Sequence, residues 1–308
     1  MAGPAMTRMR GAAIILAMLI AALAAAVAAT VFADQQRWVR TVEHRRDQVQ
    51  AQALAMAGVQ WARQILDDDA RRSEIDHLGE PWALTLPPIP MEDGEIRGSI
   101  ADAQGRLNIN ALGAADASAV QQRTRLATLF ARKGMPPVAL AAMADWIDTD
   151  GAARESGAED AFYLAQPVPH LAANAPVLRV AELGVVKGVT PQALAAILPF
   201  LSALPAGTPV NVNTAPPEVL SALADNLSAE RLDALVADRA RKPFTTIAEF
   251  RSRLPGGSVL ASDLALSVRS NYFYVTIEAR QGATQSRARA LLHRGGSERP
   301  AIVWQVVE

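Results

Sequence analysis

The chain has no cysteine, so a disulfide framework, a thiolate zinc site and a cysteine nucleophile are all excluded. Its formal net charge is only −1 across 308 residues, which leaves no overall basic surplus for binding nucleic acid. Histidine is scarce, and its copies lie far apart without metal-ligand spacing: His44, His77, His170 and His293. A Gly-x-Ser-x-Gly nucleophile elbow and a phosphate-binding loop are also missing. We therefore expect neither an enzyme nor a nucleic-acid partner.

What the chain does have is a long uncharged run near its start. Residues 12–33 carry no charged side chain, and as a helix they would span ~33 Å, enough to cross a bilayer. Arg8 and Arg10 precede the run and Asp34 follows it, which favours a cytoplasmic N-terminus with the bulk of the chain exported. A cleaved signal peptide and a plain signal anchor are two other interpretations of this run.

The residues after the run favour a continuation of the same helix. Residues 34–66 contain no proline and a single glycine, Gly58. Val42, Val49 and Met56 are seven residues apart and so form one apolar stripe, which Val59 extends. We predict one unbroken helix over residues 12–66, with this stripe docking against sister subunits.

The order of the remaining elements predicts an α+β fold. A polar connection at 67–93 precedes a hairpin or strand pair at 95–100 and 107–109. Seven helices are expected between residues 118 and 253: 118–133, 137–148, 177–185, 191–201, 216–226, 229–239 and 246–253. Alternating segments at 272–279, 284–293 and 301–307 predict an antiparallel meander with one buried face. A helical block enclosed by strands of one sheet is an insertion into that sheet domain.

The start of the chain resembles the class III signal of type IV pilins and pseudopilins: a short basic leader ending in Gly11, then an apolar helix. The resemblance implies that a prepilin peptidase cuts between Gly11 and Ala12 and methylates the new N-terminus. The fifth mature residue of such proteins is usually Glu, whereas here it is Leu16. That Glu is thought to neutralise the N-terminal amine of a neighbour within the bilayer, so its loss suits only a tip subunit.

The whole chain resembles the minor pseudopilin K (general secretion pathway protein K) family of type II secretion. The resemblance rests on four segments in order: Gly-Arg-Leu-Asn-Ile-Asn at 105–110, Asp-Trp-Ile-Asp-Thr-Asp-Gly at 145–151, Gly-Ala-Glu-Asp-Ala-Phe-Tyr at 157–163 and Val-Asn-Val-Asn-Thr-Ala-Pro at 210–216. It implies a type IV pilin-like fold divided into a leader at 1–11, a transmembrane and amphipathic spine at 12–66, the first part of the pilin-like domain at 67–111, an inserted helical domain at 112–268 and C-terminal strands at 269–308.

The same resemblance implies a role. The chain would cap the tip of the type II secretion pseudopilus and help to initiate its assembly. It would join I-type and J-type minor pseudopilins, be processed by prepilin peptidase, and cross the inner membrane once with its C-terminal domain in the periplasm.

An acidic segment at 145–160 is the candidate metal site. It carries six carboxylates and one Arg154 on a stretch broken by Gly151 and Gly157. Calcium takes six to eight oxygen ligands on flexible loops, although the EF-hand order does not continue here. A solvated acidic loop is the alternative, and the family resemblance favours structural calcium. Asp145 is the weakest candidate because it should lie on the preceding helix, which leaves Asp148, Asp150, Glu155, Glu159 and Asp160.

A second constellation resembles the helix-hairpin-helix repeat of competence-type DNA receptors, which gives a membrane-tethered DNA receptor as the alternative function. It begins at Asn211 and includes a hairpin at 224–228. That hairpin has no glycine to bring backbone amides to phosphate, and Asp225 would repel it. We interpret the repeat as architectural, with Asn213 and Thr214 capping a helix. The similar residues 107–111 suggest two related units.

Overall fold

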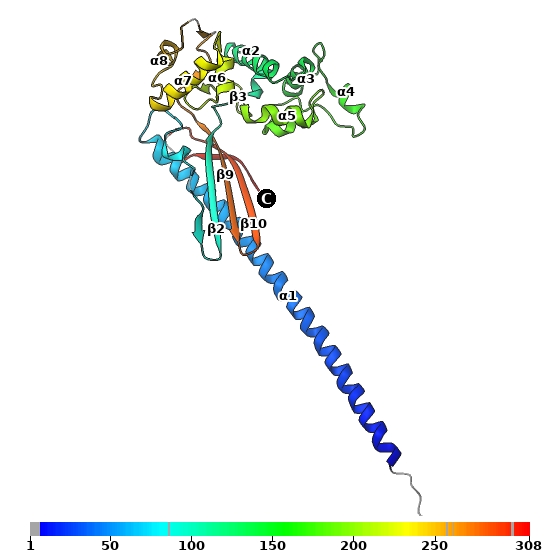
Figure 1. Cartoon of the computed structure of the whole chain (residues 1–308). Coiled ribbons are helices and arrows are strands. Elements are labelled where there is room, and N and C mark those ends of the chain that lie inside the picture. Colours follow the sequence, from blue (N-terminus) through cyan, green and yellow to red (C-terminus); the bar gives the residue numbers. More distant parts are fainter. Residues whose placement is uncertain (1–6, 86, 257, 261, 297–298) are drawn as a thin grey trace, which may run out of the picture.

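A computed structural model describes residues 7–308 except 86, 257, 261 and 297–298. One helix, α1, runs without a break over the 64 residues Thr7–Ala70, a length of ~96 Å. Figure 1 shows its first half standing free as a rod and its last part packed along a sheet. The helix is long and apolar enough to cross a membrane, and its apolar window is not buried inside the protein. The predicted continuous helix is confirmed and is longer than expected at both ends.

The sheet has five antiparallel strands in the order β1-β2-β9-β10-β11. Their bounds are β1 Ile89–Met91, β2 Gly94–Asp102, β9 Tyr272–Gln281, β10 Thr284–His293 and β11 Ala301–Val307. Val59 and Leu66 of α1 pack against Phe273 and Val275 of β9 in one buried cluster. Gly58 allows this close approach, because a Cβ there would lie 2.7 Å from Ile277 Cγ2. The predicted C-terminal meander is confirmed.

Of the two alternatives for 95–100 and 107–109, the pair of short strands is confirmed as β2 and β3 (Leu107–Asn108), whereas a hairpin between them is not formed. β2 instead forms a hairpin with β1, which lies within the expected connection. β3 pairs in parallel with β4 (Leu201–Ser202), far away in the sequence. The reason is local: Asp102 Oδ1 accepts a hydrogen bond from Gln104 N, 2.7 Å away, in a turn that carries the chain out of the large sheet.

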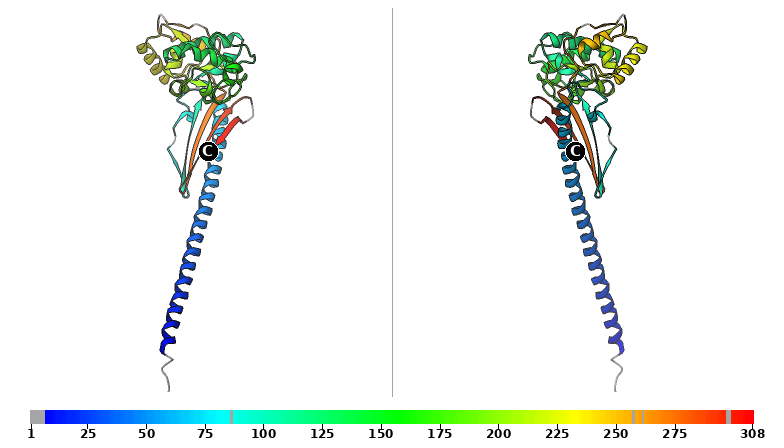
Figure 2. Two further views of the ribbon diagram at one scale, coloured as in Figure 1. Left: turned by 90° about the vertical axis from the view of Figure 1, so that its right-hand side faces the viewer. Right: turned by 90° about the vertical axis from the view of Figure 1, so that its left-hand side faces the viewer.

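The helical block lies at the end of α1 that is remote from the apolar segment (Figures 1 and 2). Polar side chains cap several helix starts, for example Asp116 Oδ1 accepting from Ser118 N. Three expected helices differ. The segment 177–185 holds only a 3-10 helix at Val180–Val185, and 191–201 is α-helical only to Ile197 before a 3-10 turn. The segment 216–226 ends early because Ala224 and Asp225 pair with a strand. The block contains η2 Ile109–Gly113, α2 Ala117–Arg132, α3 Pro137–Ile147, α4 Asp160–Leu164, η3 Val180–Val185, α5 Pro191–Ile197, η4 Leu198–Phe200, α6 Pro217–Leu223, β6 Ala224–Asp225, α7 Ala229–Arg241, α8 Ile247–Ser252 and β7 Val259–Leu260, and η1 Pro81–Ala83 lies outside it.

Two units of the block repeat one plan, as the sequence suggested. The first opens with β3 and closes with the parallel strand β4; the second opens with β5 (Val210–Asn211) and closes with the parallel strand β8 (Leu266–Ser267). In each unit the side chain of a buried asparagine forms hydrogen bonds with both the backbone N–H and the backbone C=O of one distant residue. Asn110 clamps Val177, and Asn213 clamps Phe244, at 2.8–3.0 Å.

These clamps correct one expectation. Asn213 and Thr214 do not cap a helix: α6 begins at Pro217 without a side-chain cap. Asn213 holds Phe244 instead, and Thr214 Oγ1 donates to Asp102 Oδ2 at 2.5 Å. The asparagine side chains serve as tertiary clamps because the amide can accept from the N–H and donate to the C=O of the same residue.

Candidate functional site

The acidic loop leaves α3 at Asp148 and ends where α4 begins at Asp160. The structure brings the carboxylates of Asp148, Asp150 and Glu159 together, with one oxygen of each within 4.8 Å of the others. Asp148 and Glu159 are buried and Asp150 is exposed. These three carboxylates therefore form a cup that opens to solvent on the Asp150 side.

Several oxygens of this cup lack the partners that buried oxygens normally have. Both oxygens of Glu159 and Oδ1 of Asp148 are buried and have no hydrogen-bond partner among the described residues. Glu159 is only 8% exposed. Burial, together with the negative charges of Asp145 and Asp148, raises the pKa of the Glu159 carboxyl. A divalent cation would supply the missing interaction and favour the ionised carboxylate.

Asp145 organises the loop and does not join the cup. Its fully buried carboxylate accepts hydrogen bonds from Ala158 N at 2.8 Å and from Arg154 N at 3.2 Å, and pairs with the Arg154 guanidinium at 2.7 Å. Arg154 also pairs with Asp148. Gly157 is needed for this packing, since a Cβ there would lie 1.8 Å from Asp145 Oδ2.

Two residues of the predicted ligand set lie elsewhere. Glu155 is exposed in the turn of the loop. Asp160 Oδ1 accepts a hydrogen bond from Ala172 N at 2.9 Å, which ties the start of α4 to the following loop. The predicted set of five therefore reduces to Asp148, Asp150 and Glu159. Spacing along the chain does not show which carboxylates of a turning loop point inward.

The apolar stripe of α1 is exposed at three of its four predicted positions. Val42, Val49 and Met56 are 45%, 65% and 45% exposed. Val59 is fully buried against the chain's own sheet, so its inclusion in the stripe was wrong. The three-residue step from Met56 to Val59 turns the helix by roughly 60° toward the face that holds Ala55 and the other core residues.

The predicted processing site lies at the foot of the rod. α1 runs through Gly11 and Ala12, while residues 1–6 of the expected leader lie outside the described residues. Leu16 is exposed among other apolar side chains. Cleavage at this position stays a prediction.

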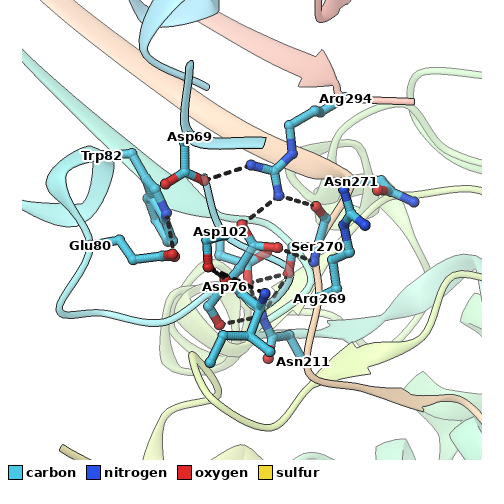
Figure 3. A network of polar contacts seen from close by, with 12 residues as sticks. Asp69, Asp76, Glu80, Trp82, Asp102, Asn211, Arg269, Ser270, Asn271 and Arg294 are labelled. Carbon is cyan, nitrogen blue, oxygen red and sulfur yellow. Dashed lines mark hydrogen bonds and ion pairs between the residues drawn. The ribbon is translucent and has the colours of Figure 1, made fainter. Parts of the chain in front are cut away.

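A buried polar network joins the helical block to the pilin-like part (Figure 3). Arg294, which follows β10, pairs with Asp69 in the last turn of α1 at 2.8 Å and with Asp76 in the next loop. Its guanidinium also donates to Ser270 O at 2.8 Å. Ser270 N in turn donates to Asp76 Oδ2 at 2.7 Å. Arg294 is only 6% exposed, so the arginine holds three separate segments without competition from water.

Asp102 extends this network into the helical block. Its Oδ2 accepts hydrogen bonds from Ser270 Oγ, Thr214 Oγ1 and Asn211 Nδ2 at 2.5, 2.5 and 3.1 Å. Burial raises the pKa of Asp102 to about 6 and that of Asp69 to about 6. Sequence reasoning missed this junction, because its charged members are separated by up to 225 residues.

The hairpin of the possible DNA-binding repeat does not form a phosphate loop. Ala224 and Asp225 form β6, paired antiparallel with β7. The Asp225 side chain is exposed there and would repel a phosphate backbone. The geometry therefore gives no support to the competence-type alternative.

Comparisons with known proteins agree with this geometry. Two models described as type II secretion system (T2SS), protein K, match residues 105–206 and 210–269, which are the two repeated units. Type II secretion system protein K of Pseudomonas aeruginosa is 32% identical, over 92% of this chain and 89% of the relative. The protein of the same name from Pectobacterium carotovorum is 30% identical, over 95% and 94%.

A solved structure shows the same fold. A chain of the GspK-GspI-GspJ complex from the enterotoxigenic Escherichia coli Type 2 Secretion System superposes with a TM-score of 0.77 at 26% identity. The match covers 87% of this chain and 99% of that chain. With its long N-terminal helix, antiparallel sheet and helical insertion, the chain belongs to the type II secretion system protein K family of minor pseudopilins.

Proposed function

We propose that this chain caps the tip of the type II secretion pseudopilus and helps to start its assembly beside I-type and J-type minor pseudopilins. The observation that carries the proposal is the position of the helical block at the end of α1 opposite the apolar segment, where it extends well beyond the width of the rod (Figures 1 and 2). A subunit stacked directly above would meet this block. The similar solved chain comes from a complex of GspK with GspI and GspJ, which supports the choice of partners.

The N-terminal apolar segment of α1 also supports a position at the tip of the filament. An acidic side chain within the apolar segment could accept the N-terminal amine of a neighbouring subunit, but Leu16 and the rest of residues 12–33 offer no carboxylate. The apolar segment would anchor the chain in the inner membrane with the sheet and helical block in the periplasm. Prepilin peptidase would cut after Gly11, and a mature chain that starts at methylated Ala12 in mass spectrometry is the expected result.

Removal of the block tests the capping role. Ala103 N donates to Tyr272 O at 2.9 Å, so the chain leaves and re-enters the sheet at neighbouring points. A short Gly-Ser linker can therefore replace residues 106–268. Immunogold labelling should place the full chain at one filament end, whereas the shortened chain carrying Leu16→Glu should also occur along the shaft. A shortened Leu16→Glu chain that still occurs only at the end would contradict the role of the block and of Leu16.

We also propose that the acidic loop holds a structural calcium ion through Asp148, Asp150 and Glu159. The support is the set of buried carboxylate oxygens without partners. Calcium at 100 times its dissociation constant should stabilise the chain by about 2.7 kcal/mol. Thermal unfolding with calcium and with a chelator measures this effect. Glu159→Gln should abolish the calcium response, whereas Glu155→Gln, a change in the same loop outside the cup, should keep it. Equal responses in both variants would refute this ligand set.

A further inference from the structure

A cleft lies between the outer face of the sheet and the helical block, apart from the stripe and the acidic loop. It encloses about 470 Å³, within the range of ligand-binding clefts. Its floor is the face of the sheet turned away from α1, where Tyr274 and Trp304 lie across β9, β10 and β11 in one row. Its roof is formed by Val180 and Leu198 of the helical block. The helical block thus lies over this part of the sheet and leaves a cleft between the two.

The charge of this cleft has one sign. Arg106, Arg179 and Arg289 line it, and none of its described lining residues is acidic. Arg179 and Arg289 are about half exposed and pair with Glu182 and Glu308. These two arginines can exchange partners readily because exposed ion pairs are weak.

Arg106 differs from the other two. Its guanidinium lies 5.3 Å from the centre of the Tyr274 ring, partly buried, and among the described residues it makes no ion pair or hydrogen bond. The indole N–H of Trp304 in the same cleft is also buried without an acceptor in the described part of the chain. A partly buried cation and a buried N–H, both without an acceptor among the described residues, favour an incoming acceptor, and a carboxylate is the strongest one that a protein offers.

We propose that this cleft binds an extended acidic segment of a partner protein. A carboxylate of that segment pairs with Arg106, and a neighbouring apolar side chain covers Leu198 and Val180. The apolar lining distinguishes this occupant from a free inorganic anion, which would leave the apolar surface in contact with water. The inference does not depend on tip capping, because it concerns a side of the sheet that a subunit can present at any position in a filament.

A peptide-binding experiment with the full chain in nanodiscs tests the inference. The probe is a fluorescein-labelled peptide of nine residues in which Glu alternates with Val and Phe, compared with the peptide in which every Glu is Gln. Fluorescence anisotropy should show salt-sensitive binding of the Glu peptide only. Arg106→Gln should weaken binding about tenfold, and Arg289→Gln about threefold. Arg280→Gln, on the same face but outside the cleft, should leave binding unchanged.

A second experiment tests whether the peptide binds in this cleft. Because the chain has no cysteine, Ser99→Cys introduces a single thiol at the floor of the cleft, and a photo-crosslinker on it should capture the Glu peptide. Equal binding of the Gln peptide, or an Arg289→Gln variant that binds like Arg280→Gln, would overturn the proposal. If inorganic phosphate displaced the peptide at a concentration equal to the dissociation constant of the peptide, the cleft would be a simple anion site. That result would overturn the proposal of a protein partner. Arg289 is exposed, so its substitution keeps the test valid even if Arg106→Gln fails to fold.

Discussion

The junction in Figure 3 gives a prediction whose size follows from the geometry. Replacement of Arg294 by Met keeps the length of the side chain and removes its charge, which leaves Asp69 and Asp76 buried without a cation. The side chains of both acids are less than 10% exposed, so water cannot replace the lost partner. Loss of one partner of a buried pair destabilises a protein by about 3–5 kcal/mol. At roughly 2–4 °C per kcal/mol, the melting temperature should fall by on the order of 10 °C.

The loss should depend on pH in a defined direction. The folded chain holds a proton on Asp69 up to about pH 6, whereas an unfolded aspartate releases it near 4. The contribution of Asp69 to the free energy of unfolding therefore becomes more favourable as the pH falls from above 6 toward 4. Without Arg294 the pKa values of Asp69 and Asp76 rise further, because the arginine lowers both. Protonation then neutralises the unpaired acids, so the variant should lose less stability at pH 5 than at pH 8.

Thermal unfolding of the detergent-solubilised chain, followed by circular dichroism at pH 8 and pH 5, measures both effects. Arg280→Met is the matched control, because Arg280 forms an exposed pair with Glu95 at 3.5 Å and its loss should change stability by about 0–1 kcal/mol. If Arg294→Met were no more destabilising than the control at pH 8, the burial argument would fail. An equal loss at pH 5 and pH 8 would refute the assignment of the effect to Asp69 and Asp76.

Two further substitutions test the helical block. Gly157→Ala places a Cβ 1.8 Å from a carboxylate oxygen of the buried Asp145, so it should destabilise the block by about 1–3 kcal/mol and weaken calcium binding, as measured by calorimetric titration. Gly151→Ala is the control, because its Cβ meets no atom within 4 Å, and it should change neither the stability nor the calcium binding. Asn213→Ala leaves both backbone groups of Phe244 without their partner and should lower the free energy of unfolding in urea by about 1–3 kcal/mol; a change below half a kcal/mol would show that water replaces the amide.

The sequence by itself determined the elements whose signals are local. The uncharged run and the seven-residue spacing of Val42, Val49 and Met56 predict the helix that α1 shows, and alternation predicts β9, β10 and β11. Period and composition act over a few residues, so each such segment carries its own signal. The repeated Asn-x-Asn segments likewise indicated two related units, which the pairing of β3 with β4 and of β5 with β8 confirms.

Only the tertiary structure decided which of these residues meet. Val59 lies in the core because the sheet covers that side of α1, and residues far apart in the chain build that sheet. Glu159 joins the acidic cup and Glu155 does not, because Asp145 and Arg154 fix the turn of the loop. Arg294 reaches Asp69 only when β10 has packed on α1. Such pairings arise from burial and chain reversal over long separations, and no local period in the sequence records them.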